Sequence, residues 1–231
     1  MILSHTHRFI YLRTKKTGST SVGLALASIC GPDDIVTPIN DPTARKLGHE
    51  PRNWRIAPDK RRWFLRLKAL WGADERAAGA VFWHHMTGEQ IRTRIGRDVF
   101  EAYTKVTIER NPWDREVSNY FWKTGKGGED RLPFADFIRD LDHRRPIDNF
   151  DIYSIKGRIV ADVVLRHENL QNDFAAFMER LGVSDAPELP SAKSSFRPQG
   201  ARAYREMYTP ETRDIVARVY RREIEAFGYD F

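Results

Sequence analysis

One stretch near the beginning of the chain runs Arg8-Phe-Ile-Tyr-Leu-Arg-Thr-Lys-Lys-Thr-Gly-Ser-Thr-Ser-Val22. The bulky residues at 9–12 predict a short β-strand, the polar residues after them predict a tight loop, and a helix is expected to open at about Ser19. A helix that follows a strand in this way leaves backbone N–H groups without partners at its first turn, where the helix dipole is positive. We therefore expect an anion site suited to a phosphate.

The residue types in this loop suit that chemistry, because glycine allows close approach of the backbone, hydroxyls add donors and lysines add charge. The candidate anion-binding residues are Lys15, Lys16, Thr17, Gly18, Ser19, Thr20 and Ser21. In the nucleoside-triphosphate P-loop the lysine follows the second glycine, and a serine or threonine after it holds Mg²⁺. Here the lysines precede the glycine, so an ATP site loses its main support.

Residues 16–21, Lys-Thr-Gly-Ser-Thr-Ser, instead resemble the 5′-phosphosulfate-binding loop of sulfotransferases, particularly the carbohydrate-type branch with bacterial members. That loop has a Pro-Lys-Thr-Gly-Gly/Ser-Thr-Ser pattern, and Lys15 stands where proline is usual. The resemblance implies 3′-phosphoadenosine 5′-phosphosulfate (PAPS) as donor and adenosine 3′,5′-bisphosphate (PAP) as product. The register favours Lys16 as the lysine that faces the leaving oxygen, with Lys15 as the alternative.

A second stretch, residues 103–122, predicts a strand followed by a helix that begins at Pro112. The spacing places Arg115, Ser118 and Trp122 along one side of that helix. Taken alone, Arg110 could simply pair with a nearby carboxylate. The pattern Arg-x-Pro-x-x-Arg-x-x-Ser-x-Tyr at 110–120 is, however, similar to the 3′-phosphate-binding segment of sulfotransferases. The resemblance implies that Arg110 and Ser118 hold the 3′-phosphate.

Between these stretches, Ala80-Val-Phe-Trp83 predicts a short buried strand that ends at His84-His85, and residues 87–90 have the capping-box pattern of a helix start. A histidine in such a place is usually structural. Residues 82–92 nevertheless resemble the segment of carbohydrate-type sulfotransferases in which one histidine is a candidate catalytic base. A neutral imidazole can accept a proton near pH 7. His85 is favoured as this base over His84.

Weaker predictions concern the second half of the chain. Residues 123–130 are rich in glycine and charge and predict a mobile loop over the acceptor. Residues 153–165 predict a hairpin with a tight Lys156-Gly157 turn and a second arm in the core. The family often closes over the 3′-phosphate with a basic loop before its last helix, which makes Arg197, together with Lys193 and Arg202, a further donor-site candidate.

The chain has 231 residues, of which 41% are hydrophobic and 30% charged, as expected for one globular domain over residues 1–231. Its apolar runs are too short for a membrane-spanning helix. The polar N-terminus and the single cysteine, Cys30, predict a cytoplasmic protein. No cluster of histidine, cysteine or acidic residues suggests a metal site, so no metal is expected.

The net charge of +6 favours acidic partners such as nucleotides, acidic glycans or nucleic acid. Basic residues are densest at 45–76, where tryptophans alternate with them. This stretch lies within residues 41–78, the part least similar to sulfotransferases and an expected family-variable basic insertion. A helix at 59–70 could be a solvated surface helix, or a wall whose indoles stack on sugars and whose arginines bind carboxylates.

Alternating strands and helices predict a three-layer α/β domain with a mainly parallel sheet, and the resemblance implies the P-loop-like sulfotransferase fold. The expected function is transfer of a sulfuryl group from PAPS to a hydroxyl or amine, by in-line displacement, with a glycan or glycolipid rather than nucleic acid as acceptor. A non-catalytic binder of polyanions or nucleic acid and an ATP-dependent small-molecule kinase are the alternatives.

Overall fold

The computed structural model of the chain describes residues 1–39, 41–55, 81–125, 131–190 and 203–231. At its centre is a five-stranded sheet in the order β3-β1-β2-β4-β7. Its strands are β1 (Ile2–Ser4), β2 (Phe9–Leu12), β3 (Ile35–Val36), β4 (Thr104–Glu109) and β7 (Val163–Arg166). Strands β2, β4 and β7 pair in parallel, whereas β1 is antiparallel to both β2 and β3. Within this sheet β1 therefore runs against the common direction, and the prediction of a mixed α/β fold with a mainly parallel sheet is confirmed.

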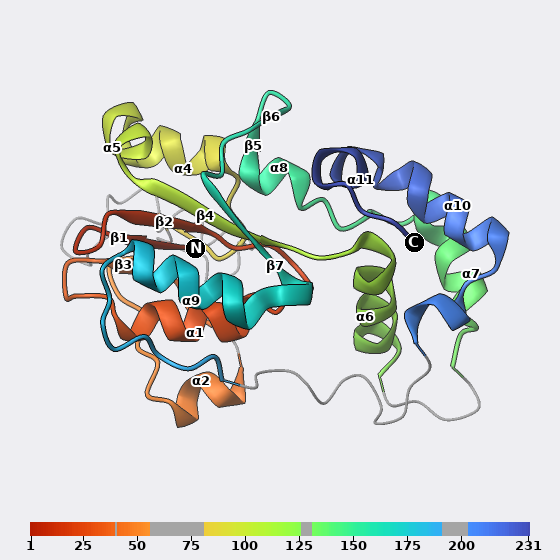
Figure 1. Cartoon of the computed structure of the whole chain (residues 1–231), viewed down its shortest axis with the longest axis horizontal. Coiled ribbons are helices and arrows are strands. Elements are labelled where there is room, and N and C mark those ends of the chain that lie inside the picture. Colours follow the sequence, from red (N-terminus) through yellow and green to blue (C-terminus); the bar gives the residue numbers. More distant parts are fainter. Residues whose placement is uncertain (40, 56–80, 126–130, 191–202) are drawn as a thin grey trace, which may run out of the picture.

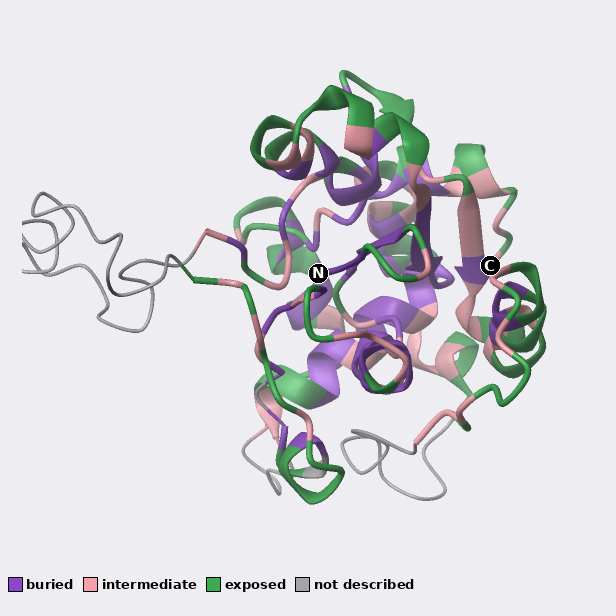
Figure 2. Ribbon diagram, turned by 90° about the vertical axis from the view of Figure 1, so that its left-hand side faces the viewer, coloured by how far each residue is buried: buried purple, intermediate pink, exposed green. Residues whose placement is uncertain are grey.

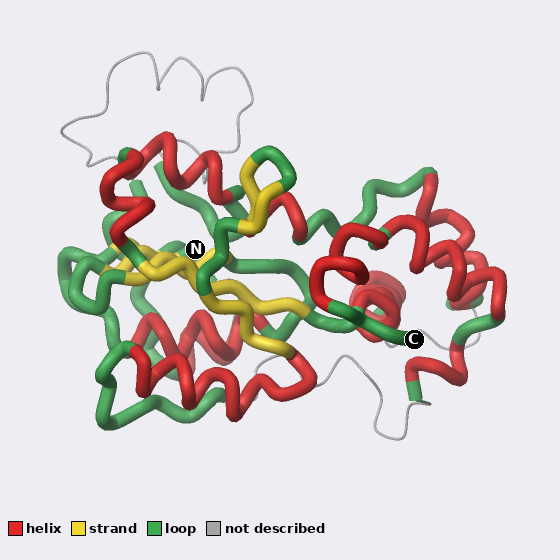
Figure 3. The backbone as a smooth tube through the Cα atoms, turned by 45° about the horizontal axis from the view of Figure 1, so that its top comes forward, coloured by secondary structure: helices red, strands yellow, loops and turns green. Residues whose placement is uncertain are grey.

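Helices cover both faces of this sheet (Figures 1 and 3). Helices α1 (Ser19–Ser28) and α9 (Leu170–Arg180) lie on one face, and α4 (Gly88–Ile95), α5 (Arg97–Ala102) and α8 (Phe150–Tyr153) lie on the other. The sequence explains this cover, because β2 is apolar throughout and buried along its whole length. Parallel strands that are buried on both faces need helices on both sides.

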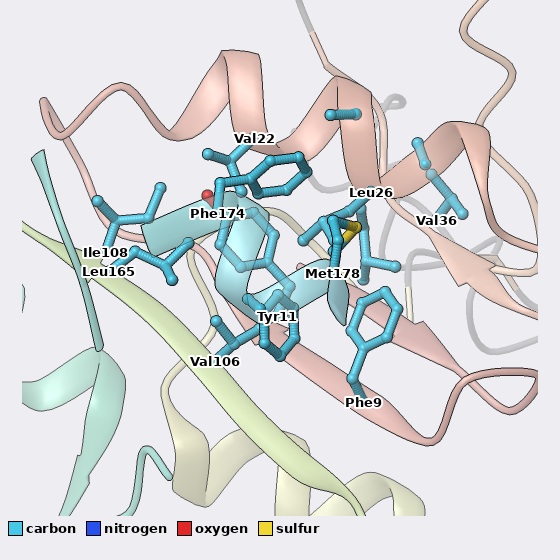
Figure 4. Close-up of a cluster of buried hydrophobic side chains, with 14 residues drawn as sticks. Phe9, Tyr11, Val22, Leu26, Val36, Val106, Ile108, Leu165, Phe174 and Met178 are labelled. Atoms are coloured by element: carbon cyan, nitrogen blue, oxygen red, sulfur yellow. The ribbon is translucent and has the colours of Figure 1, made fainter. Parts of the chain in front are cut away.

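Alternate residues of β2 pack into two different cores. Phe9 and Tyr11 pack with residues of α1 and α9 (Figure 4). Ile10 and Leu12 pack with residues of α4, α5 and α8. In Figure 2 the buried residues lie on the strands and on the inner sides of the helices. The loop between β2 and α1 thus joins two elements that are both anchored in the core.

A third cluster of helices lies beside the carboxyl ends of the parallel strands (Figure 1). It consists of α6 (Pro112–Thr124), α7 (Phe134–Arg139), α10 (Pro210–Val219) and α11 (Arg221–Phe227). Helices α10 and α11 are separated at Tyr220, whose φ is −106° and ψ 26°. The Tyr220 hydroxyl donates a hydrogen bond to the buried carboxylate of Glu116, a contact that fixes the break against α6. Shorter elements are α2 (Pro42–Lys46) and single turns at Asp140–Asp142, His167–Asn169 and Tyr204–Met207.

The strand predicted at 80–83 is wrong. Residues 81–83 have no strand conformation, and residue 80 lies outside the described part. The N–H groups of Val81 and Phe82 both donate to the carbonyl of Trp54, at 2.9 and 3.1 Å. The reason is that β1 already occupies the place beside β2, so this apolar segment packs over the sheet instead of joining it.

The hairpin predicted at 153–165 is confirmed at its turn, but its predicted second arm is divided between two strands, β6 and β7. Lys156 and Gly157 both have positive φ, 50° and 77°, between the paired strands β5 (Ser154–Ile155) and β6 (Arg158–Ile159). Strand β6 is exposed and has two residues, whereas residues 163–165 of the predicted arm belong to the central sheet, with Leu165 in the core. Asp162, just before β7, makes two hydrogen bonds with the backbone of Lys105 in β4. Its carboxylate accepts the Lys105 N–H at 2.7 Å, and its own N–H donates to the Lys105 carbonyl at 2.8 Å. These two bonds set the register of the parallel pair.

No helix in the described part of the chain is both long and apolar enough to pass through a bilayer. The predicted helix at 59–70, the insertion beyond residue 55 and the loop at 126–130 lie outside the described residues.

Candidate active site

A pocket of about 840 Å³ opens at the carboxyl ends of the parallel strands, where open α/β sheets bind ligands. The loop after β2, the segment before α4, the second half of α6 and the residues after β7 contribute to its wall. Its described lining residues include no aspartate or glutamate, but they include the cations Arg13, Lys15, Lys16, Arg110, Lys123 and Arg145. The pocket is therefore suited to an anion carrying several negative charges.

Side chains from outside the loop hold its carbonyl groups in place. The contacts are Arg13 O with His85 Nδ1 (2.9 Å), Lys15 O with Asn149 Nδ2 (3.0 Å), Lys16 O with Arg110 Nη1 (3.3 Å) and Thr17 O with His167 Nδ1 (3.2 Å). In a planar trans peptide the next N–H points away from the preceding carbonyl. The N–H groups of residues 16, 17 and 18 are therefore turned away from the side chains that hold the loop.

Gly18, the residue directly before α1, has a backbone conformation that favours glycine. Its φ is 78°, and a Cβ there would lie 3.2 Å from both His167 Nδ1 and Leu170 Cδ2. No side chain in the described part of the chain caps this helix. The first-turn N–H groups thus stand at the pocket with the positive end of the helix dipole, which suits a phosphate.

The two lysines of the loop are held differently. Lys15 is exposed, and its backbone N–H donates to Asn149 Oδ1 at 2.8 Å. Lys16 has a left-handed backbone with φ 62°. Its Nζ atom lies 5.1 Å from the centre of the Trp122 ring. Both lysines line the pocket.

Arg110 connects the strand end to the loop. Its Nε and Nη2 atoms donate to Asp114 Oδ2 at 2.8 and 2.6 Å, and its Nη1 atom donates to Lys16 O. The ion pair between Arg110 and a nearby carboxylate, which the sequence offered as the structural alternative, is therefore present. Arg110 still lines the pocket, as does Ser118 of helix α6.

Arg115 does not share the side of α6 that Ser118 and Trp122 present to the pocket. It is fully buried and bonds to Glu109 at 2.8 Å and to Glu223 at 3.2 Å. Glu109 Oε1 in turn accepts the backbone N–H of Arg110 at 3.1 Å. Arg115 therefore supports the backbone of Arg110 from behind.

His85 is held in one tautomer. A carbonyl oxygen only accepts, so the contact with Arg13 O puts the hydrogen on Nδ1 and leaves the lone pair of the neutral ring on Nε2. Burial lowers the pKa of His85 to about 3, and the charges of Arg13 and His84 act in the same direction. The His84 ring packs edge to face with His85, with centroids 4.7 Å apart, and both residues line the pocket.

The sulfotransferase family model matches residues 1–230 of the chain. The chain belongs to the sulfotransferase family. An uncharacterised protein of Archaeoglobus fulgidus is 29% identical over 103 residues, which are 43% of this chain and 85% of that protein. Family membership confirms the resemblance found at residues 16–21 and 110–120. It also supports sulfuryl transfer in general as the chemistry of the pocket.

In this member of the sulfotransferase family, most of the predicted site residues meet in one pocket. Those that line it are Lys15, Lys16, Gly18, Ser19, Thr20, Ser21, His84, His85, Arg110 and Ser118. Thr17 does not, because its hydroxyl bonds to Thr14 Oγ1 at 2.8 Å inside the loop. Arg197, Lys193 and Arg202 lie outside the described residues.

Sequence reasoning missed three residues that shape the sulfotransferase loop: Arg13, Asn149 and His167. Asn149 is fully buried and bonds to both the N–H and the carbonyl of Lys15. His167 lines the pocket, and burial lowers its pKa, with the charge of Arg110 acting in the same direction. Of these three, His167 had a sequence signal, since it comes just after the apolar residues 163–165 at the end of a strand.

Proposed function

We propose that the chain transfers a sulfuryl group from PAPS to a hydroxyl or amine of an acceptor. The observation that carries the proposal is that the predicted 5′-phosphosulfate loop and the predicted 3′-phosphate residues, far apart in the sequence, line one pocket. Membership of the sulfotransferase family supports the same chemistry.

The chemistry of the pocket fits this donor. PAPS carries a 3′-phosphate and a 5′-phosphosulfate, so it needs two cationic regions. The loop with Lys16 and the start of α1 is suited to the 5′-phosphate, and Arg110 with Ser118 is suited to the 3′-phosphate. A pocket wall without carboxylates among its described residues avoids repulsion of either group.

The chain's own residues supply positioning and charge. PAPS, when bound, supplies the sulfuryl group. Lys16 and the N–H groups at the start of α1 stabilise the negative charge that develops on the leaving phosphate oxygen. Nε2 of His85 accepts the proton of the acceptor. The low pKa of His85 keeps Nε2 unprotonated, and an anionic donor beside it raises the pKa and makes the ring a better base.

The proposed acceptor is a glycan or glycolipid. Trp122 lines the pocket and is 50% exposed. Indole faces stack well on sugar rings, since they combine a large apolar surface with a polar edge. A kinase is less favoured, because the described lining offers no carboxylate to hold Mg²⁺ beside the phosphates.

A thermal-shift titration tests the donor assignment. PAP is compared with AMP and with ATP plus Mg²⁺. Saturation to about a hundred times the dissociation constant stabilises a protein by about 2.7 kcal/mol, which raises the melting temperature by roughly 5–11 °C for a chain of this size. A shift specific to PAP is expected. A shift with ATP and Mg²⁺ but not with PAP contradicts the proposal.

A further inference from the structure

Arg13 is a buried cation beside the pocket. Its residue is 7% exposed, and its Nη2 atom donates to Thr20 Oγ1 at 3.0 Å. Its Nε atom is buried and has no hydrogen-bond partner among the described residues. A charge removed from water is normally paired with an opposite charge, because desolvation is costly. Arg13 departs from that rule.

The other two buried arginines of this region, Arg110 and Arg115, follow this rule, and Arg110 pairs with Asp114 at 2.6 Å. Arg115 is fully buried, but two carboxylates, Glu109 and Glu223, bond to its guanidinium. For Arg13, the side-chain hydrogen bond goes to the uncharged hydroxyl of Thr20, and the charge of Asp41 opposes the effect of burial on the pKa without cancelling it. Burial accordingly lowers the pKa of Arg13. Since Arg13 lines the pocket, an anionic ligand is the available source of its counter-charge.

The place of Arg13 in the sheet indicates which part of a ligand it meets. Arg110 follows β4, the phosphate loop follows β2, and His85 comes from the segment that packs on the β1 side. The backbone of Arg13 accepts from His85, and its side chain donates to Thr20. A donor with its 3′-phosphate at Arg110 and its 5′-phosphate at the loop therefore extends its far end toward Arg13 and His85.

We propose that Arg13 is a further catalytic residue that binds the oxygens of the transferred sulfuryl group, an inference that rests on the proposed function. In the reaction the sulfur–oxygen bond to the 5′-phosphate breaks and its electron pair leaves with the phosphate oxygen. A bond forms between sulfur and the acceptor oxygen or nitrogen, and the proton of that atom goes to Nε2 of His85. The Arg13 guanidinium binds the sulfuryl oxygens throughout the transfer and neutralises their charge.

The test compares Arg13→Met with Arg115→Met in the full chain. Methionine keeps the apolar stem of arginine but removes the charge. Melting temperatures are measured without ligand, and dissociation constants for PAP and for PAPS are measured by calorimetry. Because PAP lacks the sulfuryl group, the two ligands separate the transferred group from the rest of the donor.

Arg13→Met is expected to melt at or above the wild-type temperature, because it removes an unpaired buried charge. Its affinity for PAPS should fall at least about tenfold, a difference of about 1.4 kcal/mol, while its affinity for PAP changes less than about threefold. Arg115→Met breaks a buried pair and should melt about 6 °C or more below wild type.

Three results overturn the inference. A drop in melting temperature for Arg13→Met as large as that for Arg115→Met makes Arg13 a structural residue. Equal losses of affinity for PAP and for PAPS in Arg13→Met mean that Arg13 binds the 5′-phosphate instead of the sulfuryl group. An unchanged affinity for PAPS means that Arg13 does not contact the donor. If the wild-type chain binds neither ligand, the proposed function itself fails, which is a distinct outcome.

Discussion

The Nζ atom of Lys16 lies 5.1 Å from the centre of the Trp122 ring, so the loop after β2 and helix α6 meet at this lysine. A cation over an exposed indole is stabilised by roughly 0.5–1 kcal/mol. That energy is enough to bias the side chain toward the pocket. It is small beside the attraction of a phosphate, so the contact positions Lys16 without locking it there.

We expect Lys16→Ala to lower kcat about 10²–10³-fold, the usual effect of removing one group that stabilises developing charge. Lys15→Ala is the matched control, because Lys15 is the neighbouring lysine with its backbone held by Asn149. The melting temperatures of both variants should stay near the wild-type value. A larger loss of kcat for Lys15→Ala than for Lys16→Ala would assign the leaving-group role to Lys15.

His85→Asn should abolish most turnover while donor binding persists. An asparagine amide can still donate to the carbonyl of Arg13, but it has no counterpart of Nε2. Loss of a general base typically costs about 10²–10⁴-fold in kcat. His84→Asn is the control and should retain turnover within about threefold. The reverse pattern would identify His84 as the base.

Ser118→Ala should weaken PAP about tenfold or more, the scale of a hydrogen bond to a charged group, and should leave AMP binding unchanged, because AMP lacks the 3′-phosphate. Thr124→Ala is a suitable control, since that hydroxyl lies on the same helix and donates to Tyr120 O. Equal effects on both nucleotides would contradict the 3′-phosphate assignment.

Glu223→Gln should change how stability depends on pH. Burial raises the pKa of Glu223 to about 7; the pairing with Arg115 opposes this rise and the charge of Glu109 adds to it. Between its unfolded pKa of about 4.3 and 7 the native state binds more protons than the unfolded state. The stability due to Glu223 is therefore full below this window and is lost as the pH rises through 7.

Glutamine does not titrate, so the melting temperature of Glu223→Gln relative to wild type should increase between pH 5 and pH 8.5. The expected gain is of the order of 1–3 kcal/mol, or about 2–12 °C. Glu225→Gln, an exposed change on the same helix, should show no such trend. A constant difference across the pH range would mean that Glu223 keeps an ordinary pKa.

Local signals predicted much of this structure. Phe9–Leu12 forms the expected strand, and the capping box of residues 87–90 is present with both reciprocal hydrogen bonds. Pro112 opens α6, with the Asn111 side chain as its cap. Each of these features depends on residues that are neighbours in the sequence, which is why pattern and propensity were sufficient.

Long-range contacts explain what the sequence could not predict. Strand β1 has three residues, too few for a periodic signal, yet it displaces residues 81–83 from the sheet. Arg115 has the spacing of a pocket residue, but Glu223, 108 residues away, pairs with it in the interior. Asn149 belongs to no motif, and only the fold brings it to Lys15.

The contacts that hold the carbonyls of the phosphate loop span 72, 94, 134 and 150 residues of the chain. Contacts of such large sequence separation form late in folding, because long loops must close first. A nascent chain that has formed only β2 and α1 therefore contains the residues of the phosphate loop, but the contacts that hold the loop carbonyls in place have not yet formed. Donor binding then reports completion of folding, and a nucleotide present during refolding stabilises the finished protein rather than its precursors.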